Sequence, residues 1–165
     1  MKHLLMLLLL SAHTSAWQIV NDTVMGGRSS SGIEAIDDYI RFSGYLSLEN
    51  NGGFASARKM IRVNANDPIN GLELEVRGDG RQYQLRVQTD QNIGRASYAA
   101  DFPTTANEWT SVTLRPEDFY LTFRGLTFSD YPTIDFNRTQ VISIFITDKQ
   151  TGPFQLDLKQ ISALN

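Results

Sequence analysis

An alternation of apolar and polar residues with a period of two runs through this sequence and constrains its fold more than any other feature. No segment of eleven or more residues keeps an apolar stripe with helical spacing. The clearest alternation lies in residues 72–77 (LELEVR) and 81–88 (RQYQLRVQ), which are separated by Gly78-Asp79-Gly80. Two alternating runs around a turn bracketed by glycines predict a β-hairpin.

The same pattern predicts six further strands, over residues 39–48, 54–63, 93–101, 109–114, 141–148 and 154–161. Turn signals separate several of them, at Asn51-Gly52-Gly53, Asp67-Pro68 and Gly152-Pro153. Short strands at this spacing favour an all-β fold, an antiparallel β-sandwich or jelly roll. Because neither a linker nor a repeat interrupts them, we expect residues 17–165 to form a single domain.

The first sixteen residues have the three regions of a secretory signal. Met1-Lys2-His3 is basic, residues 4–10 are apolar, and residues 14–16 (TSA) are small. The apolar run is too short to span a bilayer, which needs about 20 residues. We therefore expect cleavage near Ala16 and a periplasmic or secreted protein that is not inserted in a membrane.

Cleavage at that point leaves a domain with neither histidine nor cysteine. The chain has no cysteine, and its two histidines, His3 and His13, lie in the signal. Disulfides, nucleophilic sites of the Ser-His-Asp or Cys-His type and the usual zinc sites are therefore excluded. Loss of Lys2 leaves 14 basic against 18 acidic residues, so the net charge falls from −3 to −4 and nucleic acid is not an expected partner.

One face of the predicted hairpin is polar. Its outward side chains are Glu73, Glu75, Arg77, Gln82, Gln84, Arg86 and Gln88. Such a stripe suits hydrogen bonding to a saccharide, with Tyr45, Tyr98 or Tyr120 as a stacking ring. The alternative is an ordinary solvated sheet face with cross-strand charge pairs.

Two pairs of carboxylates are candidates for other chemistry. Glu73 and Glu75 on one strand lie about 6.6–7 Å apart at the backbone, which permits glycosidase chemistry, but no second acid–base element supports it. Asp22 and Asp157 would meet if the terminal strands pair, and could then hold a structural calcium ion. The alternative is that Asp22 and Asp157 are each a capping or exposed carboxylate, because no D-x-D-x-D cluster is present. No other cofactor is expected.

Two glycine-rich segments have a structural and a binding interpretation. Met25-Gly26-Gly27 could present backbone N–H groups to an anion, or could form a tight turn that needs positive φ. Residues 50–54 (Asn50-Asn51-Gly52-Gly53-Phe54) could place amides at a ligand-binding loop tip, or could be an ordinary turn. The turn is the favoured interpretation of both. The two tryptophans are expected to be structural, with Trp17 packing on the end of the sandwich and Trp109 in its core.

Several segments, in this order along the chain, resemble the complex I intermediate-associated protein 30 family. They are residues 21–30 (NDTVMGGRSS), 42–56 (FSGYLSLENNGGFAS), 71–74 (GLEL), 77–83 (RGDGRQY), Trp109, 123–125 (FRG) and 148–156 (DKQTGPFQL). The resemblance covers residues 17–165 and implies a jelly-roll sandwich of the galactose-binding-like type with a non-catalytic role. Mitochondrial members are assembly factors for respiratory complex I, whereas the secretory signal here points to a bacterial periplasm or the cell exterior.

Three functions are compatible with these features. The resemblance favours a non-enzymatic domain that binds a protein partner as an assembly or stabilising factor outside the cytoplasm. A carbohydrate-binding module is the alternative, and a carboxylate-dependent glycoside hydrolase is the least supported. The residues expected to bind a ligand or partner are Asn51, Arg77, Gln82, Gln84, Arg86 and Arg124. Those expected to shape loops are Asp22, Met25, Gly26, Gly27, Gly52 and Gly53.

Overall fold

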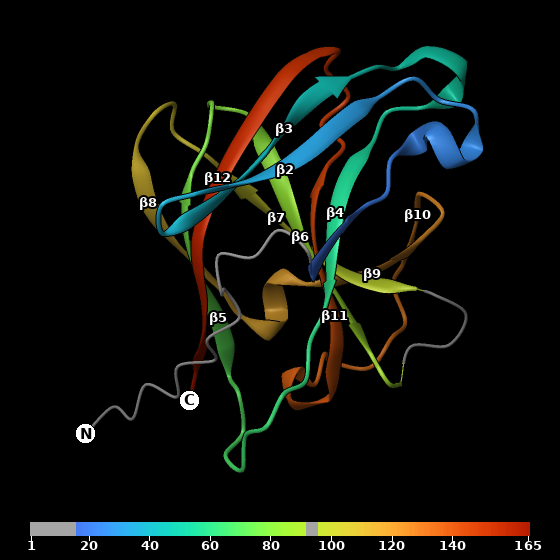
Figure 1. Cartoon of the computed structure of the whole chain (residues 1–165). Coiled ribbons are helices and arrows are strands. Elements are labelled where there is room, and N and C mark those ends of the chain that lie inside the picture. The colour runs from blue at the N-terminus through green and yellow to red at the C-terminus, as the bar shows by residue number, and fades with distance from the viewer. Residues whose placement is uncertain (1–15, 92–95) are drawn as a thin grey trace.

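The computed structural model describes residues 16–91 and 96–165, so the predicted signal lies outside the described residues except for Ala16. Within these ranges the chain forms a seven-stranded and a five-stranded antiparallel sheet that pack face to face (Figure 1). The predicted all-β sandwich is therefore confirmed. No helix in this part of the chain is long and apolar enough to cross a membrane.

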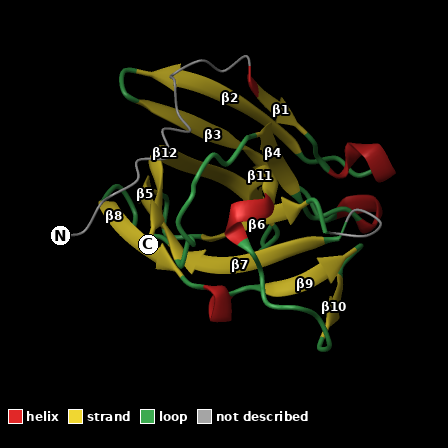
Figure 2. Cartoon of the chain, turned by 90° about the horizontal axis from the view of Figure 1, so that it is seen from below, coloured by secondary structure: helices red, strands yellow, loops and turns green. Residues whose placement is uncertain are grey.

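Each sheet mixes strands that are distant in sequence, as Figure 2 shows from below. The seven-stranded sheet has the order β1 (Trp17–Ile19), β4 (Ala55–Met60), β11 (Thr139–Ile146), β6 (Gln82–Thr89), β7 (Ser97–Pro103), β9 (Tyr120–Phe123) and β10 (Leu126–Phe128). The five-stranded sheet has the order β2 (Ser30–Ile36), β3 (Tyr39–Leu46), β12 (Gly152–Leu164), β5 (Gly71–Arg77) and β8 (Trp109–Leu114). Short 3-10 helices lie in the connections, namely η2 (Asp22–Met25), η3 (Glu49–Asn51), η5 (Pro116–Asp118) and η6 (Phe136–Arg138).

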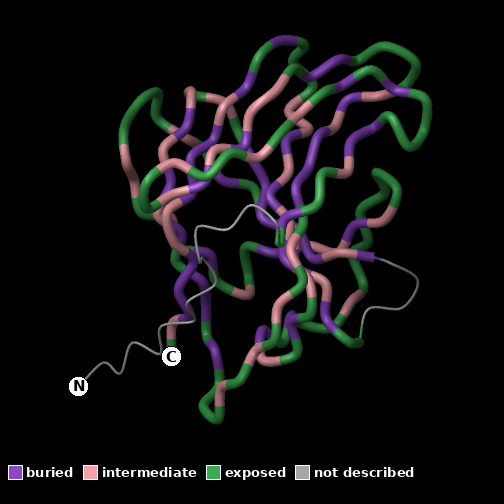
Figure 3. The backbone as a smooth tube through the Cα atoms, in the orientation of Figure 1, coloured by how far each residue is buried: buried purple, intermediate pink, exposed green. Residues whose placement is uncertain are grey.

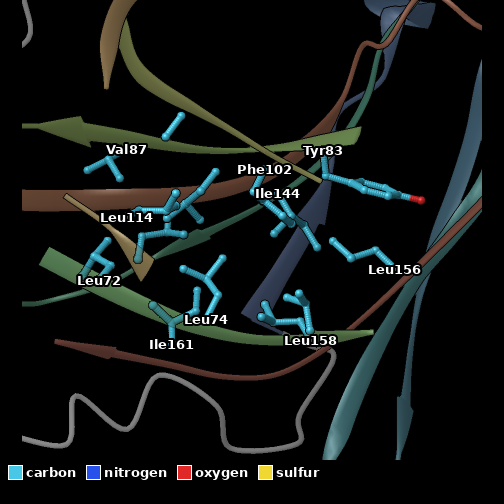
Figure 4. Close-up of a cluster of buried hydrophobic side chains, with 14 of the residues drawn as sticks. Leu72, Leu74, Tyr83, Val87, Phe102, Leu114, Ile144, Leu156, Leu158 and Ile161 are labelled. Atoms are coloured by element: carbon cyan, nitrogen blue, oxygen red, sulfur yellow. The ribbon is translucent and has the colours of Figure 1, made fainter. Parts of the chain in front are cut away.

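The core lies between the sheets and is built from the apolar half of each alternating strand (Figure 3). Tyr83 and Ile144 come from the seven-stranded sheet, and Leu74 and Leu156 come from the five-stranded sheet; all four are completely buried (Figure 4). Full burial of such a side chain stabilises a fold by about 1.5–3 kcal/mol. Since the apolar residues point inward, the polar residues between them point outward from both sheets.

The predicted hairpin is wrong, because β5 and β6 belong to different sheets. β5 pairs with β12 and β8, whereas β6 pairs with β11 and β7. Gly78-Asp79-Gly80 therefore carries the chain from one layer of the sandwich to the other. Each strand gains two partners in this way, and each still buries its apolar face in the shared core.

The Asp79 side chain holds this connection between the two sheets in place. Its carboxylate accepts hydrogen bonds from the Tyr83 hydroxyl at 3.0 Å, from the Arg81 backbone N–H at 3.0 Å and from the Gln155 backbone N–H at 2.8 Å. The crossing also requires a glycine, because a Cβ added to Gly78 would lie 2.5 Å from the Thr104 methyl group. The hydrogen bonds of Asp79 thus link β6 of one sheet to β12 of the other.

The other predicted strands are present; the strand predicted at 109–114 is β8 with the same ends, and the rest have shifted ends. The predicted strand at 93–101 is β7, which begins at Ser97, and part of the prediction lies outside the described residues. β1, β2, β9 and β10 were not predicted; three of them have only three or four residues, and β2 contains Ser-Ser-Gly. Trp17 opens β1 and packs into the core cluster.

Among the glycines of the described residues, Gly44 on β3 has the least room for a side chain. A Cβ there would overlap the Ser30 carbonyl oxygen and lie 2.7 Å from the Ser31 Cα, and both atoms are backbone of the paired strand β2. We expect Gly44→Ala to lower the free energy of unfolding by about 1–3 kcal/mol, as overpacking does.

Gly32→Ala is the matched control, because its Cβ would meet nothing within 4 Å. Thermal unfolding of both variants checks the prediction. Equal melting temperatures for the two variants would contradict it.

Candidate functional site

The predicted polar stripe is divided between the two sheets. Glu73, Glu75 and Arg77 lie on the outer face of the five-stranded sheet, while Gln84, Arg86 and Gln88 lie on the outer face of the seven-stranded sheet. Gln82 is exposed at the first residue of β6, Asn51 ends η3, and Arg124 lies in the turn between β9 and β10. Of the six predicted binding residues, only Gln84 and Arg86 come together.

Strand pairing surrounds these two residues with three others. Gln84 lies opposite Phe145 of β11 on one side and opposite Asp101 of β7 on the other. Arg86 lies opposite Ala99, which in turn lies opposite Tyr120 of β9. We call Gln84, Arg86, Asp101, Tyr120 and Phe145 the Arg86 cluster. It crosses four neighbouring strands on one outward face.

Hydrogen bonds hold the polar members of the cluster in fixed orientations. The Gln84 amide nitrogen donates to an Asp101 carboxylate oxygen at 2.7 Å and lies 3.0 Å from the Tyr120 hydroxyl. The Tyr120 hydroxyl donates to the other Asp101 oxygen at 3.2 Å. Gln84 in turn accepts from Nε of Arg86 at 2.9 Å. The network is thus organised before any ligand arrives.

Aromatic rings form one side of the cluster. The Arg86 guanidinium carbon lies 3.6 Å from the centroid of the Phe145 ring, and Phe145 stacks on Phe54 with centroids 5.2 Å apart. Both rings are partly exposed. Flat apolar surface beside hydrogen-bonding groups is the usual composition of a small-molecule site.

Burial shifts the pKa of two titratable groups in the cluster, Arg86 and Tyr120. It lowers the pKa of Arg86 to about 10, although Tyr120 and Asp101 act in the opposite direction. Burial also raises the pKa of the Tyr120 hydroxyl, and the neighbouring Asp101 adds to the effect. At neutral pH the cluster therefore presents a charged guanidinium and a protonated phenol.

Arg77, predicted to bind a ligand, is instead paired with a carboxylate of its own sheet. It donates from Nε to Asp157 at 2.9 Å, and Asp157, which has no exposed surface, also accepts from Arg41 at 2.8 Å. Hydrogen bonding to Asp157 raises the pKa of both arginines. This carboxylate links three adjacent strands, β3, β12 and β5.

Trp109 was expected in the core, and that prediction is wrong. It is partly exposed on the outer face of the five-stranded sheet, where Arg77 lies 4.8 Å and Lys159 4.9 Å from its ring centroid. The pairing of β8 with β5 places Trp109 opposite Arg77, in the outward register.

The two glutamates on β5 have a neighbouring positive charge. Lys159 pairs with Glu75 at 3.5 Å, so Glu73 and Glu75 do not form an isolated pair of carboxylates.

The suggested calcium site between Asp22 and Asp157 is also wrong. Asp22 is completely buried and accepts from the Ser29 hydroxyl at 2.6 Å, the Ser29 N–H at 2.9 Å and the Gly53 N–H at 2.7 Å. Each carboxylate thus has its own set of donors, Ser29 and Gly53 for Asp22 and two arginines for Asp157. In residues 16–91 and 96–165 no group of three His, Cys, Asp or Glu residues is placed to hold a metal.

The glycine-rich segments are structural, as the favoured interpretation predicts. Gly26 has φ +87° and ends η2, with its N–H bonded to the Thr23 carbonyl, and the Gly27 N–H is bonded to the Asp22 carbonyl. These amides are therefore not directed at an anion. A Cβ on Gly27 or Gly52 would lie 2.6 Å or less from an Asp22 oxygen, so both glycines let the loops close around that carboxylate. Met25 is exposed beside them.

Sequence reasoning missed two residues of the cluster, Asp101 and Phe145, and the adjoining Phe54. Phe145 gave a signal that could have been used, because it occupies an outward position between the inward Ile144 and Ile146. A large aromatic residue in the polar register of a strand indicates a surface with a role beyond the core.

Comparisons with known proteins agree with this architecture. The family model described as complex I intermediate-associated protein 30 matches residues 9–158. None of the curated proteins compared with the sequence matches it.

Several solved structures are similar. One is a family 11 carbohydrate-binding module of a cellulosomal cellulase of Clostridium thermocellum, with TM-score 0.67 and 10% identity, covering 100% of this chain and 95% of that one. Another is a family 11 module from the same organism in complex with a β-1,3-1,4-mixed-linked tetrasaccharide. Its TM-score is 0.63 and its identity 10%, and the match covers 91% of this chain and 89% of that one. An agarase matches with TM-score 0.62 and 9% identity over 95% of this chain but only 24% of its own. At these identities the likeness concerns the fold, and it confirms the predicted jelly-roll sandwich of the galactose-binding-like type.

Proposed function

We propose that this chain, which belongs to the complex I intermediate-associated protein 30 family, binds a saccharide on the outer face of its seven-stranded sheet. Family and fold support a non-catalytic binding domain. The observation that carries the proposal is the Arg86 cluster, an ordered set of amide, guanidinium, carboxylate and phenol groups beside two stacked rings. The predicted secretory signal supports the further proposal that binding takes place outside the cytoplasm.

The chemistry of the cluster matches that of a sugar. The oxygens of Gln84, Asp101 and Tyr120 can accept from sugar hydroxyl groups, and the terminal NH₂ groups of Arg86 can donate to them. The partly exposed rings of Phe145 and Phe54 add apolar surface. The network already fixes these groups, so binding costs less side-chain entropy. A related fold is known with a bound tetrasaccharide, which supports the same use here.

A thermal-shift panel of mono- and oligosaccharides tests this proposal on the purified protein. A ligand at 100 times its Kd stabilises the folded state by about 2.7 kcal/mol, which at about 2–4 °C per kcal/mol raises Tm by several degrees. We expect Gln84→Ala to lose most of that rise.

The matched control is Gln160→Ala, which removes a partly exposed glutamine from β12 of the other sheet. This variant should keep the full shift. If no saccharide in the panel changes Tm, the glycan-binding function is wrong and the second candidate below replaces it.

The second candidate is binding of a protein partner, the role of the mitochondrial members of the family. One observation favours it: Val24 and Met25 on η2 are 70% and 65% exposed, and Leu48 before η3 is 42% exposed. The η2 and η3 loops are joined by Asn50, whose amide donates to the Gly26 carbonyl at 3.2 Å. A hollow of about 490 Å³ at this end is lined by Arg28, Tyr45, Ser47, Leu48, Glu49 and Thr151. Exposed apolar side chains on loops fixed by Asp22 are typical of a protein-contact surface.

A further inference from the structure

Among the partly buried arginines of the described residues, Arg86 differs from the others in having no carboxylate partner. Arg81 is paired with Asp148 at 2.6 Å, and Arg41 and Arg77 are paired with Asp157 at 2.8 Å. No carboxylate of the described residues lies within 4.0 Å of Arg86, and residues 1–15 and 92–95 contain no acidic residue. Buried charges in proteins are normally paired, so this guanidinium is unusual.

The nearest carboxylate is already committed to other groups. Both oxygens of Asp101 accept hydrogen bonds, one from Gln84 and one from Tyr120. Arg86 itself has one hydrogen-bond partner in the described part of the chain, the Gln84 oxygen that accepts from Nε. Its two terminal NH₂ groups therefore keep their donors for a group that arrives from outside.

The residues on either side of Arg86 are small. Strand register places Ser143 of β11 opposite it on one side and Ala99 of β7 on the other. Neither side chain is long enough to cover the guanidinium, and Phe145 supports one face of it. Arg86 is partly exposed and has a short side chain opposite it on each paired strand.

From this geometry we infer that the ligand is an acidic saccharide, with the carboxylate of a uronic acid unit bound by the terminal NH₂ groups of Arg86. This inference rests on the saccharide-binding function proposed above. The guanidinium fork matches a carboxylate in two parallel hydrogen bonds, and such charge-assisted bonds are stronger than neutral ones. Gln84, Asp101 and Tyr120 then take the hydroxyl groups of the same or the adjoining sugar.

Isothermal titration of the purified protein with uronate oligosaccharides and their carboxyl-reduced counterparts tests the inference, because each pair differs only in the charged group. We expect the uronate to bind about ten- to a hundredfold more tightly, the usual gain from a charged hydrogen bond. Arg86→Gln should abolish the difference between the two ligands. Arg115→Gln, an exposed arginine beside η5, should keep it.

The possible results separate the two proposals. Equal or tighter binding of the reduced oligosaccharides would overturn the acidic ligand and leave the saccharide function standing. Binding of neither series, together with a flat thermal-shift panel, would overturn both. Sulfated oligosaccharides that bind as tightly as uronates would overturn the carboxylate assignment. The comparison of ligands needs no variant, so it decides the question even if Arg86→Gln does not fold.

Discussion

Replacing Asp157 with alanine is expected to lower the free energy of unfolding by about 3–5 kcal/mol, the cost of breaking a buried ion pair from one side. Asp157 has no exposed surface and accepts hydrogen bonds from both Arg41 and Arg77. Its removal leaves two partly buried guanidinium groups without this counter-ion. Since β3, β12 and β5 meet at this carboxylate, we expect the whole five-stranded sheet to lose stability.

Chemical and thermal unfolding of Asp157→Ala measure this effect. At about 2–4 °C per kcal/mol, Tm should fall by roughly 6–20 °C. Glu73→Ala is the control, because it removes an exposed carboxylate from the same face and should change stability by no more than about 0.5 kcal/mol. A loss below about 1 kcal/mol for Asp157→Ala would show that the two arginines find other partners.

Asp22→Ala is expected to be almost as damaging. Its carboxylate accepts from Ser29 and Gly53 and is completely buried, so alanine leaves several buried donors without acceptors. Each such donor costs about 1–3 kcal/mol, and we expect a total loss of about 3–4 kcal/mol. The η2 and η3 loops should loosen first, because Asp22 is the group that ties them together.

This carboxylate also predicts a dependence of stability on pH. Burial raises the pKa of Asp22, but the hydrogen bonds from Ser29, Gly53 and Phe54 outweigh it, so the net shift is downward. A group whose pKa is lowered by folding stabilises the protein above its unfolded pKa of about 3.9, and this stabilisation is lost as the pH falls through the folded pKa. We therefore expect the free energy of unfolding to fall steeply below about pH 4, and Asp22→Asn to flatten that fall. Asp130→Asn, at an exposed position, should leave the pH profile unchanged.

The sequence predicts the faces of the strands better than their partners. Leu72, Leu74, Val76, Tyr83 and Leu85 all point into the core, as their alternation predicts. Their strands were nevertheless paired wrongly, because the same alternation results whether two strands share a sheet or face one another across a core. A Gly-Asp-Gly connection serves either arrangement, and the contacts of Asp79 with Tyr83 and Gln155 that decide between them are made only in the folded chain.

Only two residues of the Arg86 cluster could be predicted as a pair, because strand pairing brings the others to them. Gln84 and Arg86 could be predicted because they are polar residues in the outward register of one strand. Asp101, Tyr120 and Phe145 join them through strand pairing over 15 to 61 residues of sequence, and only the register of the folded sheet brings them together. Arg77 has the same pattern as Arg86 in sequence, but Asp157 lies beside it and occupies its guanidinium.

The most direct test of the central claim is an NMR titration of the ¹⁵N-labelled protein with the saccharide that gives the largest thermal shift. If the outer face of the seven-stranded sheet is the binding face, the amide signals that move will concentrate on β6, β7 and β11, around Gln84, Arg86 and Phe145. Shifts confined to the η2 and η3 loops or to the five-stranded sheet, or none at saturating saccharide, would contradict the claim.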